Sequence, residues 1–232
     1  KTTGDLVLDR PLADIGGVPM IVRAWRQAVA SGLPVAVAAG DPEIVAVIEA
    51  AGGRAVLTDP NLPSGSDRIR AALEAIDPEG RHDAVINLQG DMPFADPGLA
   101  TACAALLHGQ PDCDIATLIA PEAGVADRAN PDVVKAVVAL TEGENQGRAL
   151  YFTRSTLFGD GPVWRHVGLY GYRREALMRF CAAPPGCPSG RRSSPRPRCR
   201  SITPMIWLRP GRWQPGPRPR SRRPRPAAGS GR

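Results

Sequence analysis

The fold is decided by the stretch Ala84-Val85-Ile86-Asn87-Leu88-Gln89-Gly90-Asp91. Its first five residues form an apolar run interrupted only by Asn87, which predicts a strand buried on both faces, of the central kind in a parallel sheet. The run ends at a polar tip, and ligands of open α/β sheets bind beyond the carboxyl ends of such strands. Asp91 is therefore a candidate ligand for Mg²⁺ on a nucleotide phosphate. The alternative is that its carboxylate only caps a turn.

Short apolar segments alternate with helical ones on both sides of this stretch. The pattern predicts strands at 34–39, 54–57 and 115–119 and helices at 20–30, 42–51, 66–76 and 96–107. Such alternation with short Gly/Pro connections is typical of βαβ units in an α/β fold. After residue 120 the pattern changes. It predicts strands at 133–140 and 149–153 paired across the turn Gly143-Glu144-Asn145, a strand at 167–172 and a helix at 174–181, which would add mixed or antiparallel strands and a subunit contact.

Charge divides the 232 residues into a domain at 1–183 and a tail at 184–232. The domain holds all 23 acidic residues but only 16 of the 29 basic ones, a formal charge of −7 in a chain of +6. The tail holds thirteen arginines, twelve prolines and no acid, a composition typical of disorder. Arg, Pro, Gly, Ser and Ala are also what GC-rich DNA encodes out of frame, so we expect a shifted reading frame from about Cys187. The alternative is a basic extension that binds nucleic acid or anionic lipid.

Several classes of protein lose support. The five cysteines are scattered without C-x-x-C spacing, no apolar run reaches the length of a membrane span, and no signal peptide is visible. These features predict a cytoplasmic protein. Walker A, G-x-G-x-x-G and G-x-S-x-G motifs are absent from the sequence, which disfavours the ordinary kinases and hydrolases.

Ser64-Gly65-Ser66-Asp67-Arg68 opens the helix predicted at 66–76. Amides and hydroxyls at a helix start can bind a phosphate or a base, and Arg68 can donate to an anion or a base edge. The alternative is a capping box, because Asp67 follows Ser64 by three residues.

Strand alternation places His166, Gly168, Tyr170 and Tyr172 on one face, which resembles a pocket wall more than a set of structural residues. Two cations lie nearby in the predicted sheet. Lys135 falls inside an apolar strand and is a candidate partner for a phosphate or carboxylate, and Arg154 ends the strand 149–153 as another candidate anion contact.

Several stretches, taken in this order, resemble the 3-deoxy-manno-octulosonate (Kdo) cytidylyltransferases, also called CMP-Kdo synthetases. The similarity covers about residues 10–183, and its specific parts are Q-G-D-x-P at 89–93 and R-H-x-G-x-Y-G-Y-R at 165–173. The other matching stretches are 11–21, 63–68, 130–135 and 151–154. CMP-sialate synthetases are the nearest rival family.

The resemblance implies a Rossmann-like nucleotidyltransferase sheet and Mg²⁺-dependent joining of CTP to Kdo, giving CMP-Kdo and pyrophosphate for lipopolysaccharide synthesis. It further implies a homodimer. Asp91 would bind the metal and act in catalysis with Arg154 and Lys135. The nucleotide would be bound by Arg10, Ser64, Gly65, Asp67 and Arg68, and the sugar acid by Gln89, Arg154, His166 and Tyr170, with Arg154 and His166 on its carboxylate.

Both ends depart from the family pattern. Lys1–Asp9 does not fit the family's first strand and phosphate loop, and Arg10 stands where the family has a lysine. The family's C-terminal segment, with its second metal-binding Asp, has no counterpart in the tail. We therefore expect weak or no synthesis by this chain itself, or a non-catalytic nucleotide-binding relic whose tail binds nucleic acid.

Overall fold

A computed structural model of the chain describes residues 10–121, 125–140, 146–159 and 163–182. The helices are the 3₁₀ turn η1 (Arg10–Leu12), α1 (Met20–Ala30), α2 (Pro42–Ala50), α3 (Gly65–Ile76), α4 (Pro97–Gly109), α5 (Val125–Ala129) and α6 (Arg174–Ala182). The strands are β1 (Val37–Ala39), β2 (Ala55–Leu57), β3 (Ala84–Asn87), β4 (Ile115–Pro121), β5 (Lys135–Leu140), β6 (Gly147–Thr153) and β7 (Trp164–Arg173). The predicted tail and the turn at 143–145 lie outside the described residues.

The helices begin and end where short polar residues and glycines predict. Ser64 caps α3, since its hydroxyl accepts a hydrogen bond from the Asp67 amide at 3.2 Å. Asp96 caps α4 in the same way, accepting from the Gly98 amide at 2.7 Å. After α1, Gly32 adopts a φ of 77°, a left-handed conformation that stops a helix at little cost only for glycine. Helix α5 has only five residues and was not predicted.

The strands form two sheets. β1 and β2 are a parallel pair, and the larger sheet has the order β3-β7-β5-β6 with β4 also paired to β7. The predicted pairing of the strands at 133–140 and 149–153 is confirmed as β5 with β6. The prediction of a central strand in a parallel sheet at 84–88 is wrong. Among the described strands, β3 pairs only with β7 and antiparallel, because an apolar run encodes burial and not the direction of its neighbour.

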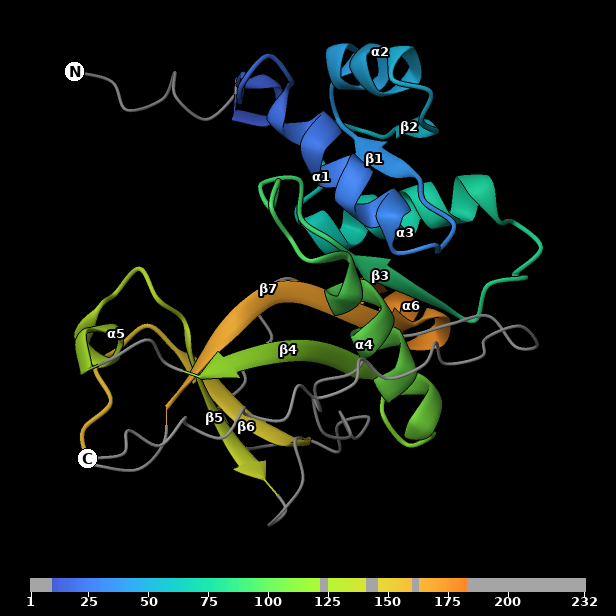
Figure 1. Cartoon of the computed structure of the whole chain (residues 1–232). Helices are drawn as coiled ribbons and strands as arrows, with labels where there is room; N and C mark the ends of the chain where they lie inside the picture. The colour runs from blue at the N-terminus through green and yellow to red at the C-terminus, as the bar shows by residue number, and fades with distance from the viewer. Residues whose placement is uncertain (1–9, 122–124, 141–145, 160–162, 183–232) are drawn as a thin grey trace, which may run out of the picture.

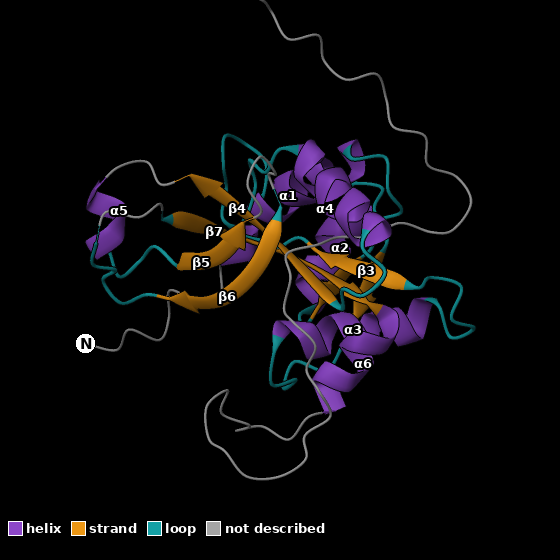
Figure 2. Cartoon of the chain, turned by 90° about the horizontal axis from the view of Figure 1, so that it is seen from below, coloured by secondary structure: helices purple, strands orange, loops and turns teal. Residues whose placement is uncertain are grey.

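Helices cover both faces of the β3–β7–β4 region, with α1 and α4 on one side and α3 and α6 on the other (Figure 2). On the α4 side, Cys103, Leu107 and Leu169 are fully buried in the main core. On the other side, Leu73 of α3 and Leu177 of α6 pack against Tyr172. The three layers place the carboxyl end of β3 beside the middle of β7 (Figure 1).

A bulge shapes the middle of β7. Thr117 of β4 pairs with Tyr170, but the next residue, Leu118, pairs with Val167, so Gly168 and Leu169 are additional on β7. An insertion of two residues preserves the alternation of side chains, so His166 and Tyr170 remain on one face, as predicted. None of the helices in the described ranges is long and apolar enough to span a bilayer.

Candidate active site

The turn after β3 presents Asp91 to solvent. The Met92 amide donates to the Gln89 carbonyl at 3.1 Å and closes the turn. The turn packs closely against α1, since a Cβ at Gly90 would lie 2.8 Å from Ile21 Cδ1. Asp91 is exposed, and within the described residues its carboxylate makes no hydrogen bond or ion pair. The carboxylate does not cap the turn, which leaves it available to a ligand.

An aromatic row on β7 faces this turn. The His166 ring lies 5.1 Å from the Tyr170 ring and 4.8 Å from the Phe152 ring of β6, and Tyr170 lies 6.2 Å from Tyr172, measured between ring centroids. Gln89 lies over Gly168, since a Cβ at 168 would be 3.5 Å from its Nε2. The structure therefore brings Gln89, His166 and Tyr170 together, as the pocket-wall interpretation requires.

The aromatic row on β7 can contact a ligand through hydrogen bonds and ring faces. Burial lowers the pKa of His166, which favours the neutral imidazole. Burial, with the neighbouring Tyr172, raises the pKa of Tyr170, which keeps its phenol protonated. Charge in this part of the site must therefore come from other residues.

The start of α3 shows the Ser64 half of a capping box. The Ser64 hydroxyl accepts from the Asp67 amide at 3.2 Å and donates to Asp67 Oδ2 at 2.5 Å, while no hydrogen bond from the Ser64 amide to Asp67 occurs within the described residues. The backbone of Gly65 and Ser66 remains at the helix N-terminus, where amides can meet an anion. Ser66 Oγ lies 3.3 Å from the Tyr172 hydroxyl, which ties this helix start to the aromatic row.

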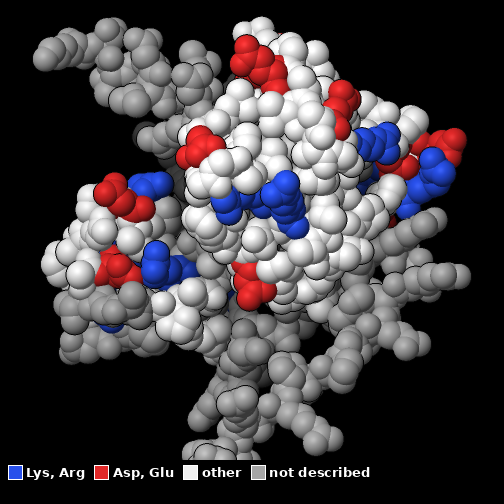
Figure 3. Space-filling model, turned by 45° about the horizontal axis from the view of Figure 1, so that its top comes forward, with Lys and Arg blue, Asp and Glu red and all other residues white. Residues whose placement is uncertain are grey.

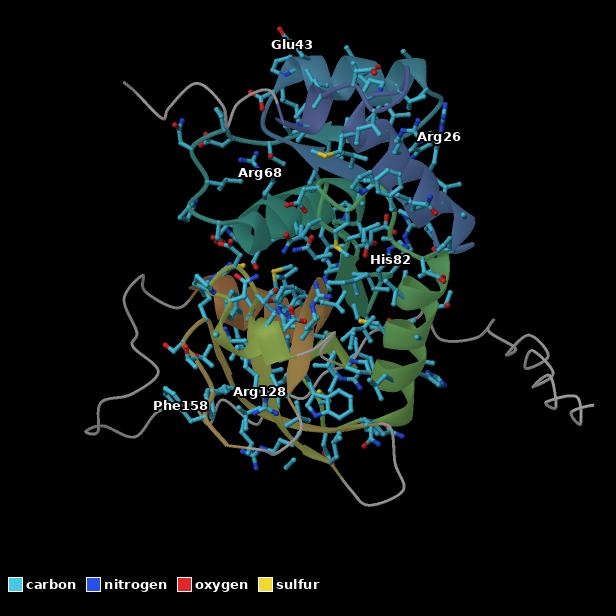
Figure 4. All side chains as sticks on the ribbon, turned by 60° about the vertical axis from the view of Figure 1, so that its left-hand side comes forward. Arg26, Glu43, Arg68, His82, Arg128 and Phe158 are labelled. Atoms are coloured by element: carbon cyan, nitrogen blue, oxygen red, sulfur yellow. The ribbon has the colours of Figure 1, made fainter. Side chains whose placement is uncertain are left out.

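Arg68 braces the carboxyl ends of the parallel pair. Its Nη1 donates to Thr58 Oγ1 at 2.7 Å and to the Asp59 carbonyl at 3.3 Å, and a Cβ at Gly40 would lie 2.6 Å from the same nitrogen. Figure 4 shows Arg68 in the upper part of the molecule, far from Arg128 and Phe158, which lie in the lower part. The side chain of Arg10 lies outside the described part of the chain.

Two cations hold the loop before β5 against the end of β6. Lys135 is fully buried, and its Nζ donates at 2.8 Å to the carbonyls of Asn130 and of Arg154. The exposed Arg154 donates from Nη1 at 3.1 Å to the carbonyls of Pro131 and Asp132. Catalytic roles for both stay predictions. In this structure Lys135 positions the segment that carries Arg154.

This geometry predicts different effects for the two cations on stability. Lys135→Met removes two hydrogen bonds from a charged donor, each contributing about 1.5–3 kcal/mol, and should lower the Tm by at least about 5 °C. Arg154→Met and the exposed control Arg26→Met (Figure 4) should each stay within about 2 °C, because surface substitutions change little. Thermal unfolding followed by circular dichroism measures this, and equal Tm values for all three variants would refute a scaffold role for Lys135.

Comparison with known proteins agrees with this architecture. A profile of the cytidylyltransferase family matches residues 7–187. The chain belongs to that family. It is 54% identical over 179 residues to the 3-deoxy-manno-octulosonate cytidylyltransferase of Rhodospirillum rubrum, covering 76% of this chain and 71% of the relative. The enzyme of the same name from Parvibaculum lavamentivorans is also 54% identical, with 76% and 68% covered.

A solved structure confirms the fold class of this cytidylyltransferase. The CMP:2-keto-3-deoxy-manno-octonic acid synthetase complexed with CTP superposes with a TM-score of 0.64 at 33% identity, covering 75% of this chain and 71% of that one.

A residue that sequence reasoning missed is Thr117 of β4, whose hydroxyl lies 2.7 Å from His166 Nε2. A threonine in an apolar strand carries no distinctive signal, because β-branched residues are common in strands.

Proposed function

We propose that the chain joins CTP to Kdo, giving CMP-Kdo and pyrophosphate. The observation that carries this proposal is the meeting of the Gln89–Asp91 turn with the His166–Tyr170 row, in a chain 54% identical to a 3-deoxy-manno-octulosonate cytidylyltransferase. In the reaction, a sugar hydroxyl oxygen bonds to the α-phosphorus of CTP. The bond from that phosphorus to the bridging oxygen breaks, pyrophosphate leaves, and the hydroxyl proton is released. Little covalent chemistry falls to the protein, so it acts by positioning and by neutralising charge.

The residues near Asp91 are suited to Mg²⁺ that enters the site bound to the nucleotide phosphates. Among the described residues, no group of three His, Cys, Asp or Glu side chains is placed to hold a metal ion. Mg²⁺ is commonly held by one or two carboxylates together with substrate phosphates, and the unpaired carboxylate of Asp91 meets that demand. The ion would supply charge neutralisation at the reacting phosphate. We place the nucleotide between this turn and the start of α3, with Gly65, Ser66 and Arg68 as its contacts.

The sugar acid is placed along the aromatic row. Gln89, His166 and Tyr170 offer hydrogen-bonding groups, and Arg154 is the exposed cation on the adjoining strand end. A carboxylate needs cationic or hydrogen-bonding donors, and Arg154 supplies the permanent charge.

Activity is measured on the chain itself and on a chimera. In the chimera, residues 10–187 are preceded by the N-terminal segment and followed by the C-terminal segment of the Rhodospirillum rubrum relative. Both ends are replaced because the resemblance places the phosphate loop in the first segment and a further metal-binding carboxylate in the last.

Steady-state kinetics with both substrates varied test the assignment of the sugar-acid site. We expect His166→Ala and Arg154→Ala in the chimera to raise the KM for Kdo by roughly 10-fold or more, the loss of one or two polar contacts, with a smaller effect on the KM for CTP. Arg26→Met should change neither. Equal increases in both KM values would remove these residues from the sugar-acid site.

Assembly and location complete the proposal. We propose a homodimer formed through the β6 edge, because Leu150 and Tyr151 of β6 are apolar and more than half exposed. We also propose a cytoplasmic location, in keeping with the buried free thiol of Cys103. The nucleic-acid alternative concerns the tail, which lies outside the described residues. On the face in Figure 3, the described residues carry charges of both signs, interspersed.

A further inference from the structure

Thr117 occupies an unusual position beneath the bulge of β7. Its side chain is fully buried, and its hydroxyl oxygen lies 2.8 Å from the Leu169 carbonyl and 3.2 Å from the Val167 carbonyl. Both carbonyls flank the additional residues Gly168 and Leu169. One threonine thus reaches the backbone on either side of the bulge.

The direction of these hydrogen bonds follows from chemistry. A carbonyl oxygen only accepts, so both contacts need the single hydroxyl proton of Thr117. The third contact of the same oxygen is to His166 Nε2 at 2.7 Å. With its proton already directed to the carbonyls, the hydroxyl has only lone pairs left for the ring, and Nε2 must be the donor.

We infer that Thr117 fixes His166 in the Nε2–H tautomer, so that Nδ1 meets the substrate as a hydrogen-bond acceptor. A neutral imidazole carries one N–H, and here Thr117 takes it. Nδ1 is then the remaining polar atom of the ring, and within the described residues no hydrogen bond to it occurs. Thr117 is a positioning residue, acting on substrate through His166.

The consequence concerns which part of the sugar acid His166 recognises. This step rests on the proposed function. An acceptor nitrogen binds a sugar hydroxyl and repels a carboxylate, so His166 selects for a correctly placed hydroxyl. The carboxylate then falls to Arg154, which differs from the role that the family resemblance assigned to His166. Burial, which lowers the pKa of His166, keeps the ring in this accepting form.

Nitrogen-15 NMR of the full 232-residue chain tests the tautomer without any activity. The chain has three histidines, and His166→Gln identifies the His166 signals. We expect Nε2 of His166 to show a protonated-type shift coupled to its ring protons and Nδ1 an unprotonated-type shift. An Nδ1–H pattern, or an even mixture of the two tautomers, would overturn the inference whether or not the chain makes CMP-Kdo.

Two substitutions then separate positioning from packing. Thr117→Val keeps the shape but removes the hydroxyl, and should shift the tautomer population and raise the KM for Kdo in the chimera by roughly 3- to 10-fold, with the KM for CTP unchanged. Thr117→Ser restores the hydroxyl and should restore both readouts. The matched control is Thr101→Val, since the Thr101 hydroxyl only donates to Gly98 within α4. An unchanged tautomer in a folded Thr117→Val variant would contradict the proposal.

Discussion

Replacing Asp91 with asparagine is expected to slow pyrophosphate release from CTP and Kdo in the chimera by on the order of 100-fold or more. The carboxylate lies in the solvent-exposed turn after β3, without a partner among the described residues, so its loss should leave the fold intact. Asparagine keeps the shape and removes the negative charge. A charge that holds a metal at the reacting phosphate is worth several kcal/mol in the transition state.

The size of this effect distinguishes the metal role from a minor turn contact. The Tm of Asp91→Asn should stay within about 2 °C of the parent, as for other exposed positions. Asp96→Asn is a matched control, because Asp96 is an exposed acid in the same loop that only caps α4. It should keep most of the activity. Turnover by Asp91→Asn near that of the parent would remove Asp91 from the metal site.

The largest expected effect on stability belongs to Asp77, at the end of α3. Its fully buried carboxylate accepts from the amides of Arg81 at 2.9 Å and His82 at 2.8 Å and from Arg174 Nη1 at 2.6 Å. The same guanidinium donates from Nη2 to the Asp77 carbonyl at 2.8 Å. This cluster joins α3 and α6 to the loop that leads into β3 (Figure 4 labels His82). Asp77→Ala removes the acceptor of both amides and the charged partner of Arg174 Nη1, and the Tm should fall by on the order of 10 °C.

The Asp77 carboxyl also makes the stability of the fold depend on pH. Burial alone would raise the pKa of Asp77, but the His82 and Arg81 amides and the His82 ring together lower it well below the ordinary value of 3.8. A carboxyl whose pKa is lowered by folding stabilises the native state above its unfolded pKa and loses that contribution as the pH falls through the folded value.

Urea unfolding at a series of pH values measures this. The stability of the parent should exceed that of Asp77→Asn at pH 7, and the difference should shrink as the pH falls below about 4. The surface acid Glu74, which pairs with Arg70 at 3.4 Å, provides the control Glu74→Gln, for which little change is expected. A difference between parent and Asp77→Asn that stays constant down to the acid limit would contradict the charged role of this carboxylate.

Much of the fold was predictable because local chemistry fixes it. Ser64, Asp96 and the glycine after α1 mark helix ends through contacts within a few residues, and the apolar runs mark strands by burial. The pairing of strands is harder to predict than their positions, because it depends on residues far apart in the chain. The antiparallel partners of β3 lie 83 to 89 positions later in the chain, at 170–173, and the bulge of β7 forms against β4, about 50 positions earlier.

The candidate site was predictable in its residue types but not in its hydrogen bonds. The alternation of β7 correctly placed His166 beside Tyr170, because strand geometry is regular and the bulge adds an even number of residues. The burial of Lys135 against two carbonyls depends on how β5, β6 and the loop at 130–132 meet, which no local pattern encodes. The contact of Thr117 with His166 joins two strands and was invisible for the same reason.

The central claim is that these residues form a site that transfers a cytidylyl group to Kdo. Phosphorus-31 NMR of the chimera with CTP, Mg²⁺ and either Kdo or sialic acid tests it most directly, with the chain itself measured alongside. The account predicts that CMP-Kdo and pyrophosphate appear in equal amounts with Kdo, with little product from sialic acid, and that both products depend on Asp91. No CMP-Kdo from the folded chimera, or faster product formation from sialic acid, would contradict it.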